Sequence, residues 1–152
     1  MPTPSETKTP PEETLSSGML PSLIGYHIRI AQNAIFRDFA ERLGEFQITP
    51  GLFGVLVIIE SNPDLKQSEL ARATHLDRSS VVAIIDKLEK RNLVERRPAL
   101  NDRRSNALRL TAEGITLLNK LKKRVVEHEK RMTRKLTPEQ CKMLAALLHE
   151  LF

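Results

Sequence analysis

The chain has 152 residues, 40% of them apolar and 28% charged, which is the size and composition of one globular domain. It carries 24 Lys and Arg against 19 Asp and Glu, and the resulting net charge of +5 favours an acidic partner such as nucleic acid. The one cysteine, Cys141, excludes an internal disulfide and a thiolate metal site, which is typical of a protein from a reducing compartment. We therefore expect a cytoplasmic protein.

The N-terminal sequence and the apolar stretches argue against export and membrane insertion. Residues 1–18 are rich in Pro, Thr, Ser and Glu without apolar periodicity, which predicts a disordered tail and no secretory signal. The longest apolar stretch, Gly51–Ile59, is about half of the roughly 20 residues that a bilayer-crossing helix needs. We expect no contact with a membrane.

Two helices are predicted in the first third of the chain. Apolar residues recur at steps of three and four over about residues 20–43, which is the spacing of one helix face. Residues 52–59 are rich in Val and Ile and would also suit a buried strand. Thr49 followed by Pro50 is typical of a helix start, so we expect a second helix there.

Two further helices and a hairpin follow. A short helix is predicted over about 67–74, and Asp77 occupies the N-cap position of the next, 78–91. Asn92 suits the left-handed residue that ends a helix. Residues 93–97 and 105–110 alternate around a turn, which predicts a two-stranded hairpin with a basic tip. The inner stripe of the fourth helix consists of Val81, Ile84, Ile85 and Leu88.

The last two helices both begin at a threonine. Thr111 precedes a long helix over about 112–134, and Thr137 with Pro138 begins a final helix that carries an apolar stripe. The residues predicted to face inward on the long helix are Ile115, Leu118, Leu121, Val125 and Met132.

The net positive charge lies in one segment. Residues 72–109 hold ten basic and five acidic side chains, whereas the flanking segments, with net charges of −4 and +4, cancel. A basic run of this kind is usually a solvated surface. Here, however, a short helix, a turn, a second helix and a basic hairpin follow one another, which is the order of a winged helix-turn-helix.

Burial of the stripe on 78–91 turns the opposite side of that helix outward, where it can enter a major groove. Arginine on the hairpin tip can reach a narrow minor groove. The predicted DNA-contacting residues are Arg78, Ser79, Ser80, Val82, Ala83, Lys87, Arg103 and Arg104. Arg96, Arg97 and Arg109 lie on the hairpin strands, where they either contact phosphates or pair with local acids.

Five segments resemble the MarR family: Leu70-Ala71, Asp77-Arg78-Ser79-Ser80-Val81, Leu88-Glu89-Lys90-Arg91, Asn101-Asp102-Arg103-Arg104 and Leu110-Thr111-Ala112-Glu113-Gly114. The resemblance implies a mainly α fold of six helices with a β-hairpin wing, in an intertwined homodimer. Residues 19–48 and 112–152 would form the dimer and 49–111 the DNA-binding domain. The predicted interface residues are Leu20, Leu144, Leu147, Leu148 and Leu151.

The resemblance also implies specific roles around the wing. Asp77 or Asp102 would pair with a wing arginine such as Arg104. The chain departs from the family at Val82-Ala83, where relatives carry Ser-Arg, so that thymine methyl contact would replace an arginine contact to a base.

Relatives often bind small aromatic acids or their acyl-CoA thioesters, and Gly25–Arg29 is similar to the hydroxycinnamoyl-CoA-responsive branch. Candidate ligand contacts are Tyr26, His27, Arg29, Arg37 and Phe53. His27 is equally a candidate for a packed core or interface residue. Cys141 is interpreted as a structural thiol rather than an oxidant sensor.

The resemblance thus implies a repressor that such a ligand releases from a palindromic operator. The alternative is a winged-helix module that binds protein or RNA without operator specificity. No catalytic motif is present in the sequence, so we expect neither an enzyme nor a bound cofactor or metal.

Overall fold

The computed structural model describes residues 15–99 and 102–151, without the side chains of residues 99 and 102–105. The chain divides into two compact units, residues 1–33 and residues 34–152. Most of the predicted disordered tail, residues 1–14, lies outside the described part, and residues 15–17 have no regular structure. The first unit contains the short helix η1 (Leu20–Ser22) and the start of α1 (Ile24–Leu43).

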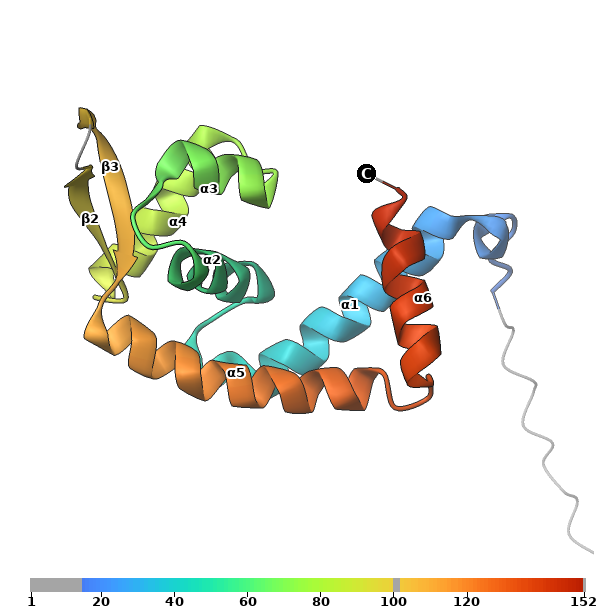
Figure 1. Cartoon of the computed structure of the whole chain (residues 1–152). Coiled ribbons are helices and arrows are strands. Elements are labelled where there is room, and N and C mark those ends of the chain that lie inside the picture. Colours follow the sequence, from blue (N-terminus) through green and yellow to red (C-terminus); the bar gives the residue numbers. More distant parts are fainter. Residues whose placement is uncertain (1–14, 100–101, 152) are drawn as a thin grey trace, which may run out of the picture. The chain divides into compact units, whose positions relative to one another are not determined.

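The second unit contains the end of α1 and all later elements (Figure 1). Within the described residues the chain has six α-helices and one small sheet, which confirms the predicted mainly α fold. In chain order the remaining elements are η2 (Gly44–Phe46), α2 (Pro50–Ser61), β1 (Leu65–Lys66), α3 (Gln67–Thr74), α4 (Arg78–Lys90), β2 (Val94–Ala99), β3 (Asp102–Leu110), α5 (Ala112–Met132) and α6 (Pro138–His149).

Helix starts follow the capping residues that the sequence offers. Thr49, Asp77, Thr111 and Thr137 each accept a hydrogen bond from a backbone N–H in the first turn of the helix that follows. Residues 52–59 are therefore helical, and the strand alternative is wrong. Asn92 adopts the left-handed conformation expected of it, with φ 54°.

The sheet has three antiparallel strands in the order β1-β3-β2, where the sequence predicted two. The hairpin of β2 and β3 is confirmed, with Val94 opposite Leu110 and Arg97 opposite Ala107. Strand β1 adds only Leu65 and Lys66, paired with Leu108 and Ala107. Two residues are too few to show an alternating pattern, so periodicity could not reveal this strand.

The core lies where α2, α3, α4 and α5 meet the sheet. Its fully buried side chains include Leu56, Ile59, Leu70, Ile85, Leu88, Leu108, Leu118 and Leu121. The predicted stripe of α4 is confirmed at Val81, Ile85 and Leu88, while Ile84 is half-buried.

The prediction for Ile115 is wrong, because its side chain is 45% exposed. Gly114 faces inward instead, against the backbone of Leu93. A Cβ at Gly114 would lie 2.0 Å from the Leu93 carbonyl oxygen, so only a glycine allows this approach of α5 to the start of β2.

Helix α6 has no buried residue among those described, and the side chains of Met143, Leu144, Leu147, Leu148 and Leu151 are all exposed. The apolar stripe predicted from the sequence is therefore an uncovered surface on this chain.

No single helix in residues 15–99 and 102–151 is long and apolar enough to cross a membrane. One bent pair, α1 through η2 with α2, meets the length and composition of a span.

Candidate nucleic-acid interface and ligand cavity

Asp77 fixes the first turn of α4, the predicted recognition helix. Its Oδ1 accepts hydrogen bonds from the Ser79 hydroxyl and from the Ser80 N–H at 2.9 Å, and its Oδ2 accepts the Ser80 hydroxyl at 2.6 Å. These bonds lower the pKa of Asp77, with the side-chain bond from Ser79 contributing most. Both serine hydroxyl hydrogens are directed at Asp77, so toward a DNA base each serine presents an acceptor oxygen.

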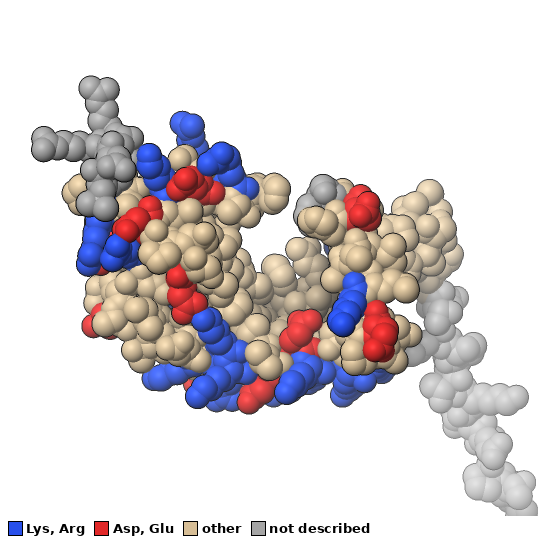
Figure 2. Space-filling view, in the orientation of Figure 1, with Lys and Arg blue, Asp and Glu red and all other residues tan. Residues whose placement is uncertain are grey.

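The outward side of α4 is exposed as the sequence predicted. Arg78, Ser79, Val82, Ala83 and Lys87 are exposed, and Ser80 is half-buried. Basic side chains gather around α3, α4 and β2, and also along α5 (Figure 2). The helix therefore offers a mixed surface, with cations near both ends and apolar groups between them.

The three strand arginines pair with local acids, which is the second of the two alternatives predicted for them. Arg96 contacts Asp86 at 2.6 Å and also Glu89, and it is only 19% exposed. Arg97 pairs with Glu95. Arg96 thereby joins β2 to α4, whereas the ion pair of Arg97 lies within β2.

Arg109, the third strand arginine, pairs with Asp64 through two hydrogen bonds. The hydrogen bonds between the two side chains lower the pKa of Asp64 and raise the pKa of Arg109. Asp64 sits in the left-handed region at φ 65°, just before β1, so the pair ties the turn into β1 to strand β3.

The side chains of Asp102, Arg103 and Arg104 lie outside the described part of the structure. Their predicted DNA contacts, and the predicted pairing of Asp77 or Asp102 with a wing arginine, remain predictions.

The five predicted ligand contacts lie in different units. Tyr26, His27 and Arg29 belong to the first unit, where the exposed His27 donates from Nε2 to the Pro21 carbonyl oxygen at 2.8 Å. Tyr26 meets the His27 ring edge-on, with 5.6 Å between the ring centroids. Arg37 and Phe53 belong to the second unit, where Arg37 is exposed and Phe53 half-buried.

A cavity of about 770 Å³ lies within the second unit. Among the described residues its wall includes none of the five predicted contacts. Residues of α1, of the segment between α1 and α2, of the start of α2 and of α4 line it, and Lys87 is the cation among them. The lining residues are Phe36, Phe39, Ala40, Gly44, Gln47, Ile48, Thr49, Pro50, Gly51 and Lys87. A mainly apolar cavity with one cation suits an aromatic ligand that carries a negative charge.

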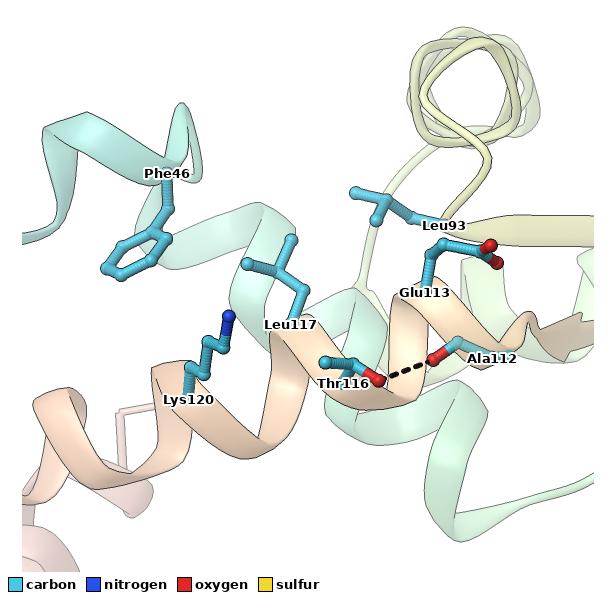
Figure 3. A pocket seen from close by; sticks show the side chains of 7 residues that line it. All are labelled: Phe46, Leu93, Ala112, Glu113, Thr116, Leu117 and Lys120. Carbon is cyan, nitrogen blue, oxygen red and sulfur yellow. Dashed lines mark hydrogen bonds between the residues drawn. The ribbon is translucent and has the colours of Figure 1, made fainter.

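A second hollow, of about 460 Å³, lies between η2, the start of β2 and α5 (Figure 3). The Phe46 ring, Leu93 and Leu117 supply its apolar wall, with Glu113 and Lys120 beside them.

A polar cluster around the buried His128 joins α1 to α5 beside the larger cavity. Asp38 Oδ2 lies 2.7 Å from His128 Nδ1, and Asp38 Oδ1 accepts from Arg131 Nε at 3.2 Å. His128 is 3% exposed, and its ring meets Phe39 edge-on with centroids 5.5 Å apart. The bond to His128 is the main cause of a lowered pKa at Asp38.

Sequence reasoning did not single out this cluster. The signal was nonetheless present, because His128 continues the inner stripe of α5 after Leu118, Leu121 and Val125. A histidine on a buried helix face needs a polar partner there.

A helix-turn-helix followed by a strand hairpin, with the outer side of its second helix exposed, defines a winged-helix DNA-binding fold. The model of the "MarR family" matches residues 48–105. The chain is 34% identical over 139 residues to "Putative transcriptional regulatory protein for hcr operon" of Thauera aromatica, covering 91% of this chain and 84% of that protein. The chain belongs to the MarR family of transcriptional regulators, which confirms the resemblance seen in the sequence.

Solved structures of one repressor, CouR, resemble the chain in two states. CouR bound to a 23-mer DNA duplex is 36% identical with a TM-score of 0.86, over 91% of this chain and 98% of that one. CouR bound to p-coumaroyl-CoA is 34% identical with a TM-score of 0.83, over 91% of this chain and 97% of that one.

Proposed function

We propose that the protein is a cytoplasmic, dimeric transcriptional repressor that acts by binding and not by catalysis. Residues 49–111 bind duplex DNA, and residues 19–48 with 112–152 form the dimer. The observation that carries the proposal is the exposed outer face of α4, which stays free while Val81, Ile85 and Leu88 anchor the helix in the core. The similarity to CouR, whose structure with a DNA duplex is known, supports it.

In this proposal Arg78 contacts a phosphate, and Val82 and Ala83 contact thymine methyl groups. Ser79 and Ser80 accept hydrogen bonds from base amino groups, because their own hydrogens are held by Asp77. Arg103 and Arg104 on the wing enter the neighbouring minor groove.

Selection from a random duplex library, followed by footprinting, tests the DNA-binding role. We expect a palindrome with half-sites about 10 to 10.5 base pairs apart, centre to centre, because two α4 helices enter successive major grooves. Affinity should fall steeply as salt rises, since several phosphates are neutralised. Uniform protection without a selected sequence, or preference for RNA, would support the alternative winged-helix module.

The effector of this repressor is an aromatic acid or its CoA thioester, and it binds in the 770 Å³ cavity. The rings of Phe36 and Phe39 contact its aromatic part, and Lys87 meets its negative charge. The similarity to CouR bound to p-coumaroyl-CoA supports this ligand class.

Calorimetry with p-coumaroyl-CoA and with the free acid tests the ligand class. A matched pair of variants locates the site: Ala40→Trp fills the cavity and should abolish binding, whereas Arg37→Gln, on the same helix but outside the cavity wall, should retain it. Retained binding in Ala40→Trp would place the ligand elsewhere. Loss of binding in Arg37→Gln would instead favour the contact predicted from the sequence.

A further inference from the structure

Arg91 connects the end of α4 to the connector between α1 and α2, here defined as residues 44–49. Its Nη1 donates to the Gln47 carbonyl oxygen at 2.8 Å and its Nη2 to the Phe46 carbonyl oxygen at 2.7 Å. A planar guanidinium that holds two consecutive carbonyls fixes both their distance and their orientation. Gln47 is in the left-handed region at φ 51°, which makes its peptide a sharp turn of defined geometry.

The same connector forms part of the wall of the larger cavity. Gly44, Gln47, Ile48 and Thr49 line that cavity, while the Phe46 ring lines the 460 Å³ hollow (Figure 3). A ligand in the larger cavity therefore contacts the connector directly.

The C-terminal end of α4 reaches both the cavity and the connector. Lys87 and Arg91 are four residues apart and so lie on the same side of the helix, with Lys87 at the cavity wall and Arg91 on the connector carbonyls. The body of α4 is anchored by fully buried Ile85 and Leu88, so it moves as a rigid element.

From this geometry we infer that Arg91 is the positioning residue that transmits ligand binding to the recognition helix. The inference rests on the proposed function and deepens its regulation. A ligand that fills the cavity displaces the connector, and the two hydrogen bonds of Arg91 carry that displacement to α4. Without them the connector moves alone and the DNA-binding face keeps its position.

Fluorescence titration of the full-length dimer with its selected duplex tests the inference, with and without saturating p-coumaroyl-CoA. In the wild type the ligand should weaken DNA binding roughly 5- to 150-fold, the usual range of allosteric coupling. In Arg91→Lys and Arg91→Gln this factor should fall below about 2, while the ligand affinity measured by calorimetry stays unchanged. Arg91→Lys retains the charge but cannot hold both carbonyls at once.

Lys90→Gln is the matched control, because it removes the neighbouring exposed cation and leaves the connector contacts in place. Its coupling factor should equal that of the wild type. Folded Arg91 variants that bind the ligand and keep the wild-type factor would overturn the inference.

Hydrogen exchange separates failure of the inference from failure of the proposed function. If the wild type responds neither to p-coumaroyl-CoA nor to the free acid, the proposed effector class is wrong. Hydrogen exchange alone then tests whether Arg91 holds the connector. Faster exchange at the amides of residues 44–49 in Arg91→Lys, with α6 unchanged, would support its hold on the connector. Unchanged exchange at residues 44–49 in Arg91→Lys would overturn the inference.

Discussion

Asp38 of α1 carries a charge that bonds two residues of α5. Hydrogen bonds from His128 and Arg131 hold its pKa below the ordinary value of 3.8. A carboxyl group with a lowered folded pKa stabilises the fold above its unfolded pKa, and this contribution is lost as the pH falls through the folded pKa.

We expect Asp38→Asn to lower the free energy of unfolding at pH 7 by about 1–3 kcal/mol, because His128 and Arg131 lose a charged acceptor. The difference from the wild type should shrink as the pH falls from 3.8 through the lower folded pKa of Asp38, because the wild-type carboxylate becomes protonated over that range. Urea unfolding at a series of pH values measures both effects. Glu41→Gln, an exposed change three residues along the same helix, serves as control, and a difference that persisted undiminished in acid would contradict the prediction.

The arginines of the DNA-binding segment should differ in their response to salt. Arg78→Gln should reduce the slope of log affinity against log salt by about one per subunit, because a phosphate contact is lost. Arg96→Gln should leave the slope nearly unchanged, since Asp86 and Glu89 already neutralise this guanidinium. Fluorescence titrations at several salt concentrations distinguish the two. Equal slopes for both variants would show that the internal ion pairs open on DNA.

At the scale of elements, capping chemistry made the fold predictable. Thr49-Pro50 and Thr137-Pro138 mark helix starts in the sequence, and the structure begins α2 and α6 there. Strand β1 was not predictable because its two residues form a strand only by pairing with β3, which lies some 40 residues later in the chain. Local patterns report local interactions and miss a strand made only by a distant partner.

Ile115 shows how a stripe can be misassigned by one position. Counting apolar residues places it in the core, but the close approach of α5 to Leu93 needs a residue without a side chain, and Gly114 supplies it. The helix is therefore turned so that its neighbour Ile115 faces outward. A count of large apolar residues passes over glycine, so it could not place Gly114 at the inward position.

Gly114→Ala should destabilise the fold by about 1–3 kcal/mol, the usual cost of an added group in a packed site. The new Cβ would lie 2.0 Å from the Leu93 carbonyl oxygen, so α5 must move away from β2. Gly54→Ala is the matched control, because its Cβ would meet nothing within 4 Å inside α2. It should be neutral or stabilising by roughly 0.5–1 kcal/mol, since alanine favours helices. Thermal unfolding of both variants tests the contrast.

At the scale of the whole molecule, the exposed outer face of α4 was accessible to sequence reasoning and the 770 Å³ cavity was not. The outer face of α4 follows from one helical period, since burial of Val81, Ile85 and Leu88 determines what points away. The cavity joins Phe36 and Phe39 of α1 to Lys87 of α4, and no local pattern connects residues so far apart in the chain.

The exposed apolar side of α6 gives the last prediction, which concerns the dimer. Leu144, Leu147 and Leu151 are 47%, 61% and 60% exposed, and a patch of this kind is usually covered by a partner. Leu147→Glu should shift sedimentation from dimer to monomer, because a buried unpaired carboxylate opposes association. Operator affinity should then fall by more than about tenfold, since a monomer reaches only one half-site.

Two controls make this prediction specific. Lys142→Gln alters an exposed polar residue of the same helix and should preserve both the dimer and operator binding. Arg104→Ala should weaken DNA binding while the protein still sediments as a dimer, because its proposed role is confined to the minor groove. If Leu147→Glu remained dimeric, α6 would not form the interface, and its apolar side would have to be covered in another way.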